Sequence, residues 1–223
     1  MNRKLKGADF VRLILAGERD FAGAKIESGF DASRNYYFAD LQKYLADEYL
    51  SLCDSPITLS NASLKGFRAE GVYFAFVFAK NADFEGACFS GADLRFANLK
   101  GANLKGVNFW KARLCNAYLQ NAFLADANLY YADLREAHFE GVKSLGASKG
   151  LGRSLFGKTR VGMSELKIIK NARDTLLVHE KPHRHYDLLG AYMDNCHAHH
   201  SYEKFVVAEQ NLMPSELEAA LVH

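Results

Sequence analysis

A five-residue repeat runs through the middle of this chain, over residues 61–143. From Asn81 it reads NADFE GACFS GADLR FANLK GANLK GVNFW KARLC NAYLQ NAFLA DANLY YADLR EAHFE GV. One position of the repeat is small, since 12 of its 17 residues between 62 and 142 are Ala and 4 are Val, and Leu or Phe follows two residues later in almost every unit. A period of five matches neither the 3.6 residues of an amphipathic helix nor the 2.0 of a half-buried strand. The chain must therefore turn a corner in every unit, so that one small and one large apolar residue always point inward.

This pattern resembles the A-(D/N)-L-x-x signature of the pentapeptide-repeat family. The resemblance implies a mainly β fold, a right-handed quadrilateral β-helix in which each pentapeptide forms one side and four form a coil. It also implies that inward residues stack on their equivalents one coil away, as Leu64 would on Phe84. Phe67, Ala69 and Ala79 depart from the pattern, so the first coil is expected to be the least regular.

The chain outside the repeat is predicted to be helical. We divide it into an N-terminal cap with a helical insertion (1–60), the β-helix (61–145), and a linker with a helical C-terminal region (146–223). Apolar spacing predicts helices over 7–17, as a cap on the first coil, and over 37–50, as the insertion.

Beyond Val142 the five-residue register fails. The glycine-rich and basic residues 144–160 are interpreted as a loop or linker. Apolar spacing then predicts a helix over 163–178 and shorter ones over 187–193 and 201–211, which make up the helical C-terminal appendage.

Charge and cysteine content limit the function classes. The formal net charge is +2, and acidic and basic residues nearly balance in each of the three segments. A basic face for nucleic acid is therefore not expected, nor a membrane span, because no stretch approaches about 18 apolar residues. The four cysteines show neither paired spacing nor zinc-like doublets, and the N-terminus shows no signal peptide. These features predict a reduced, cytoplasmic protein.

Aromatic residues at outward positions of the repeat are the candidate interaction sites. Exposed aromatic columns are unusual on a monomer, so either the chain's own helices or a partner protein would cover them. Trp and Tyr are frequent hot-spot residues at interfaces. The candidate residues for protein interaction are Phe96, Trp110, Tyr118, Tyr130 and Tyr131.

Seven of the eight histidines follow residue 178. Cys196 with His199 or His200, and His183 or His185, could supply zinc ligands, but no single spacing matches a known zinc finger, and ordinary polar loops are the preferred interpretation. No phosphate-binding loop, dinucleotide fingerprint, nucleophile elbow or HExxH motif is present. We therefore expect neither catalysis nor a cofactor or resident metal.

The leading hypothesis is a non-catalytic scaffold that binds an unidentified protein through a rigid surface, and a homodimer is possible. The resemblance implies one alternative, because some members of the family mimic duplex DNA, bind DNA gyrase and confer quinolone resistance. Those members are strongly acidic, whereas Lys100, Lys105 and Arg113 lie outward here. A second alternative is metal or ligand binding by the histidine-rich C-terminal region.

Overall fold

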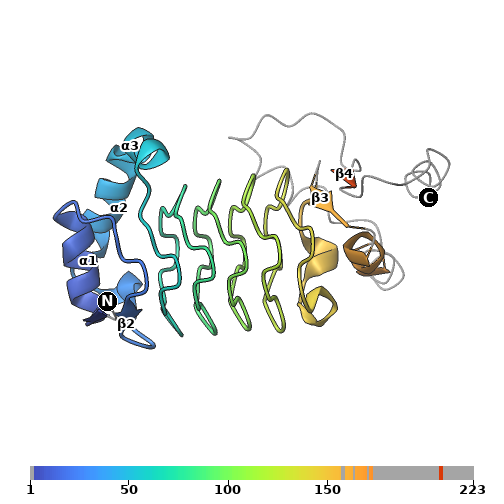
Figure 1. Ribbon diagram of the computed structural model, residues 1–223, viewed down its shortest axis with the longest axis horizontal. Helices are drawn as coiled ribbons and strands as arrows, with labels where there is room; N and C mark the ends of the chain where they lie inside the picture. The colour runs from blue at the N-terminus through green and yellow to red at the C-terminus, as the bar shows by residue number, and fades with distance from the viewer. Residues whose placement is uncertain (1–2, 157–158, 163, 170, 173–205, 208–223) are drawn as a thin grey trace, which may run out of the picture.

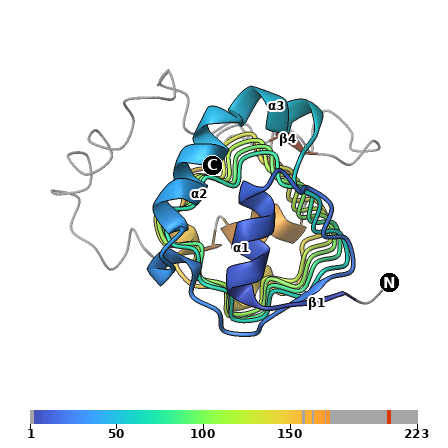
Figure 2. The ribbon, with the colours of Figure 1, turned by 90° about the vertical axis from the view of Figure 1, so that its left-hand side faces the viewer.

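The computed structural model describes residues 3–156, 159–162, 164–169, 171–172 and 206–207. Its centre is a β-helical solenoid, and a helical cap lies at the N-terminal end (Figure 1). Viewed along the solenoid, the coils superpose into one four-sided outline (Figure 2). The β-helix predicted from the repeat is therefore confirmed, whereas its right-handed sense stays a prediction.

Parallel backbone bridges join residues that are 20 positions apart, such as Asp83 to Asn103 and Asn103 to Phe123. Four pentapeptides therefore make one coil, as the resemblance implies. We name the four sides of the coil after their inward residues Phe84, Phe89, Leu94 and Leu99. Each corner is turned by one residue with φ near +60°, a conformation that suits Gly, Asn and Asp.

The core is the axis of the solenoid. Every residue at the small position and every Leu or Phe at the large position two residues later is buried there, with Ala102 and Leu104 fully inaccessible. The coil of residues 61–80, which was expected to be the least regular, is the second coil of the solenoid. It keeps this arrangement because the sizes are exchanged: Phe67 fills the small position, and Ala69 takes the large one. Exchange of a large and a small residue preserves the packed volume, which cores tolerate well.

Helix α1 (Gly7–Leu15) closes the N-terminal end of the core. Strand β1 (Lys4–Leu5) precedes it and pairs in parallel with β2 (Lys25–Ile26), which belongs to the first coil. Phe10 of α1 is fully buried and packs edge-on against Phe21, with 4.8 Å between the ring centroids. The helix thus covers apolar side chains that an open end would leave in water.

An insertion replaces the Leu94 side of the first coil. It comprises the 3-10 helix η1 (Ala32–Arg34) and the helices α2 (Phe38–Asp47) and α3 (Tyr49–Asp54). Gln42 of α2 takes the place of the missing strand. Its Oε1 accepts a hydrogen bond from the Tyr73 backbone N–H at 2.9 Å, and its Nε2 donates to the Gly71 carbonyl at 2.6 Å. Two backbone groups at the edge of the second coil, the Tyr73 N–H and the Gly71 carbonyl, therefore have a side chain as their hydrogen-bond partner.

The interpretation of 144–160 as a loop or linker needs correction, because the coil continues there. Asn128 pairs with Lys149, Asp133 with Leu155, and His138 with Arg160. The sides are longer than five residues because the 3-10 helices η2 (Leu145–Ala147) and η3 (Leu151–Arg153) form part of them. Leu145, Leu151 and Phe156 lie inward and extend the core.

The tail adds to the C-terminal edge of this last coil. Strand β3 (Arg160–Val161) pairs in parallel with β4 (Val206–Val207). The expectation of a helix over 201–211 is therefore wrong at Val206–Val207, where backbone pairing with β3 prevails over the apolar spacing. Residues 164–169 and 171–172 are helical, and the other elements expected after residue 172 lie outside the described residues.

Candidate functional site

Three of the candidate aromatic residues lie close together at the Phe89 side of the solenoid, near its C-terminal end, and all three are exposed. Trp110 and Tyr130 occupy equivalent positions one coil apart, and Tyr131 follows at the next corner. Their side chains are 39–40% exposed. With Lys111 and Arg153 they form what we call the aromatic patch.

An amide ladder fixes the backbone beneath the two aromatic columns. Asn108 Oδ1 accepts a hydrogen bond from the Trp110 N–H at 3.1 Å, and Asn128 Oδ1 does the same for Tyr130. Asn128 Nδ2 also donates to Asn108 Oδ1 at 2.9 Å. These bonds tie both aromatic residues to a rigid frame, which lowers the entropy lost when a partner binds.

Both charged side chains of the patch are cationic and lie against its rings. Lys111 Nζ is 4.2 Å from the centre of the Trp110 ring, in cation–π geometry. Arg153 comes from η3 of the added coil and donates a hydrogen bond to Tyr131 Oη at 2.7 Å. The sequence did not indicate Arg153, because the coil that carries it was not expected.

Phe96 belongs to a different surface. It follows the Leu94 side and stacks on Phe76, with ring centroids 5.1 Å apart and planes within 8°. Tyr49 of α3 packs edge-on against Phe76 at 5.1 Å. The insertion therefore covers one end of this column, while Phe96 itself remains 39% exposed.

Tyr118 lies on the Leu99 side, away from the patch residues. Its ring stacks on His138 at 4.6 Å, and Lys100 Nζ lies 5.0 Å from the ring centre. Burial lowers the pKa of His138 below its ordinary value. Glu140 acts in the opposite direction, but Arg160 and Lys100 reinforce the lowering.

This lowered pKa predicts a pH-dependent loss of stability. The unfolded chain binds the His138 proton more readily than the folded chain, so stability should fall as the pH drops below the unfolded pKa of about 6.5. His138→Phe keeps an aromatic ring against Tyr118 and cannot titrate. We expect the variant to lose less stability than the wild type between about pH 7.5 and about pH 5.5, measured by urea unfolding. An equal loss in both proteins would contradict this account.

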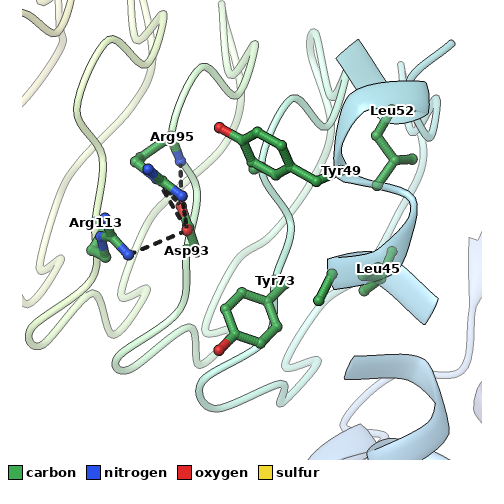
Figure 3. Close-up of a pocket in the computed structure, with 9 residues that line it drawn as sticks. Leu45, Tyr49, Leu52, Tyr73, Asp93, Arg95 and Arg113 are labelled. Carbon is green, nitrogen blue, oxygen red and sulfur yellow. Dashed lines mark hydrogen bonds and ion pairs between the residues drawn. The ribbon is translucent and has the colours of Figure 1, made fainter. Parts of the chain in front are cut away.

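The structure also forms a pocket that the sequence did not indicate, between α2–α3 and the Leu94 side (Figure 3). Its volume is about 160 Å³. One part of the wall is apolar, and the other part carries charge. The lining residues are Leu45, Ala46, Tyr49, Leu52, Tyr73, Ala75, Asp93, Arg95 and Arg113.

Asp93 is the buried charge of this pocket, at 4% exposure. Arg95 Nε lies 2.9 Å from Asp93 Oδ1, and Arg95 Nη2 lies 2.7 Å from Oδ2, so this pair is bidentate. Arg113, one coil further, reaches the same Oδ2 at 3.5 Å. The Arg95 guanidinium also lies 5.7 Å from the centre of the Tyr49 ring, which projects from α3 toward it (Figure 3).

Within the described ranges, no group of three or more His, Cys, Asp and Glu side chains is placed to hold a metal ion. The proposed ligands Cys196, His183, His185, His199 and His200 lie outside those ranges. No helix in the described part of the chain is both long and apolar enough to cross a membrane.

Comparison with known proteins identifies the repeat. A family model described as "Pentapeptide repeats" matches with 8 copies, over residues 57–91, 70–110 and 111–143. No curated protein sequence shows significant similarity to the chain.

Three solved structures are similar to parts of the chain. QnrB1, a plasmid-mediated fluoroquinolone resistance protein, is 15% identical, with a TM-score of 0.32; the match covers 52% of this chain and 61% of that one. The pentapeptide repeat protein Rfr23 from the cyanobacterium Cyanothece 51142 is 30% identical over 47% of this chain and 63% of its own, with a TM-score of 0.22. HetL from Nostoc sp. strain PCC 7120, a protein involved in heterocyst differentiation regulation, is 21% identical over 71% and 69%, with a TM-score of 0.27. The chain spans less than two thirds of the first two structures.

Proposed function

Because its repeats make this chain a member of the pentapeptide-repeat family, we propose that it is a non-catalytic interaction module whose aromatic patch binds a partner protein. Trp110, Tyr130 and Tyr131 would make the contact. The observation that carries the proposal is that these three rings are exposed to a similar extent on one rigid surface. Such anchors contribute much of the binding energy at protein interfaces.

The corner residues support this assignment. Of the 17 corner positions between 61 and 141, 12 are Gly, Asn or Asp, which adopt positive φ readily. The five exceptions are Phe76, Phe96, Lys111, Tyr131 and Glu136, whose side chains disfavour this conformation, and two of them lie in the patch. A local backbone cost of this kind is a reason to look for a function at these residues.

The charge of the patch indicates the chemistry of the partner. Lys111 and Arg153 would attract a surface that combines carboxylates with apolar side chains. These cations oppose the mimicry of duplex DNA, which needs a dense negative surface. The module would act in the cytoplasm, where the thiols of Cys53, Cys88 and Cys115 stay reduced.

Affinity purification from native lysate tests the proposal. The bait proteins are the wild type, Trp110→Ala/Tyr130→Ala, and Phe78→Ala as the control. Phe78 is 38% exposed but lies on the Leu99 side, so it matches the exposure of the patch residues at another site. We expect one protein to be retained by the wild type and the control and lost with the double variant. Each hot-spot truncation should weaken binding roughly thirtyfold, equivalent to about 2 kcal/mol.

Thermal unfolding of all three baits separates lost binding from lost folding. If the double variant folds normally and retains the same proteins as the wild type, the patch is not the interaction surface. Recovery of the untagged chain itself, confirmed by light scattering of the purified protein, would identify the partner as a second copy.

A further inference from the structure

The pocket between α2–α3 and the Leu94 side is separate from the aromatic patch and has a distinct chemistry. It combines an apolar wall, formed by Leu45, Ala46, Leu52 and Ala75, with the Asp93, Arg95 and Arg113 cluster. Figure 3 shows the helices facing the charged cluster across the pocket. We propose that this pocket binds a small organic monocarboxylate with a compact apolar body.

The first step is the charge of the wall. Asp93 and Arg95 form a closed bidentate pair, with both carboxylate oxygens engaged. Arg113 brings a second positive charge and makes one longer ion pair, 3.5 Å from the already occupied Oδ2. The wall therefore carries two cations and one carboxylate, a net charge of +1 that a single ligand carboxylate neutralises.

The second step is the pairing along the Leu94 side. Asp133 and Arg135 repeat the Asp93–Arg95 pair two coils further on, with 2.6 Å between Arg135 Nη2 and Asp133 Oδ2. Arg113 lies between these pairs in the same column as the two aspartates, and position 115 of its own coil holds Cys instead of a third arginine. Each aspartate is thus matched by its own arginine, and Arg113 is the additional cation.

The third step is accessibility and geometry. The Arg113 side chain is 36% exposed, whereas that of Asp93 is 5% exposed, so the additional cation lies at the open part of the pocket. A planar guanidinium matches the two oxygens of a carboxylate. The buried Asp93 and the Tyr49 ring hold Arg95 in place, so the charged wall is organised before a ligand arrives.

The fourth step is size. A volume of about 160 Å³ is close to that of an engineered cavity that admits benzene. Leu45 and Leu52 would contact the apolar body of the ligand while Arg113 binds the carboxylate. Benzoate has this combination of ring and single charge, and benzamide is its neutral counterpart of the same shape.

NMR titration of the full chain at neutral pH tests the proposal, with benzoate and benzamide as probes. We expect benzoate to shift the backbone amides of α3 and of Arg113 with a Kd on the order of 1 mM, and benzamide to bind at least tenfold more weakly. Arg113→Gln should weaken benzoate binding at least tenfold. Lys80→Gln, which removes an exposed cation from another side, should leave it unchanged.

A second variant tests the apolar half without removing charge. Ala46 is exposed on α2 and lines the pocket, so Ala46→Phe should fill the space and abolish benzoate binding without disturbing the core. Thermal unfolding verifies that each variant is folded. Equal binding of benzoate and benzamide, unchanged benzoate binding in folded Arg113→Gln, or shifts confined to residues outside the pocket would each overturn the proposal. The aromatic patch plays no part in these measurements, so their outcome is independent of the proposed function.

Discussion

Replacement of Phe10 by alanine is expected to lower the free energy of unfolding by about 3–5 kcal/mol. Phe10 is fully buried at the N-terminal end of the core, where its ring packs edge-on against Phe21 and Phe67. Truncation removes both aromatic contacts and leaves a cavity beneath α1. Urea unfolding followed by circular dichroism measures the change.

Unfolding of the Phe10→Ala variant should begin at the N-terminal end, because each coil of a solenoid contacts only its neighbours. Hydrogen exchange should therefore accelerate first at the amides of Phe21 and Ile26, and later at those of Leu124 and Leu129. Leu50→Ala is the control, since Leu50 is 80% exposed and its truncation should change stability by less than about 0.5 kcal/mol. A Phe10→Ala effect as small as that of the control would show that α1 does not close the core.

Substitution of Gly150 by alanine is also expected to lower the free energy of unfolding strongly, by about 2–5 kcal/mol. Gly150 has a φ of 75°, which L-residues adopt only at a cost. A β-carbon there would lie 2.5 Å from the Tyr130 backbone nitrogen and closer still to Cγ of the Tyr130 ring. Since a backbone atom cannot move aside easily, the added coil would have to shift away from its neighbour. Chemical denaturation of the variant and the wild type measures the difference.

Gly146→Ala is the matched control within the same coil. No atom would lie within 4 Å of its added β-carbon, apart from its chain neighbours, and its φ is not in the left-handed region. It should change stability by less than about 0.5 kcal/mol. If Gly150→Ala were equally mild, residues 144–160 would not pack on the preceding coil as the structure places them.

The central coils could be predicted from the sequence because each one repeats the same local requirement. An alanine such as Ala102 and a leucine such as Leu104 recur at fixed positions, so the register of stacking follows from counting. The last coil could not be found in this way. It is joined to the preceding coil by backbone hydrogen bonds, such as Leu129 N–H to the Lys149 carbonyl and Leu134 N–H to the Leu155 carbonyl. These bonds do not depend on which side chains are present, and the sides of the last coil contain extra residues that break the period.

The candidate interaction residues could likewise be predicted only in part from the sequence. Trp110 and Tyr130 are 20 residues apart, so counting four pentapeptides to a coil is enough to put them in one column, and the bridge spacing places them one coil apart. Phe96 and Tyr118 lie on other sides, so the five candidate residues do not form a single surface. Arg153 joins the patch only through the added coil.

The sequence by itself determined the β-helical architecture and the outward position of its aromatic residues, because a period of five leaves the chain only one way to bury a small and a large residue in every unit. The tertiary structure alone decided that the solenoid continues beyond residue 143, which rings share a surface, and that a charged pocket exists. These features depend on contacts between segments far apart in the chain, such as Tyr49 of α3 with Arg95 of the solenoid, which no local pattern encodes.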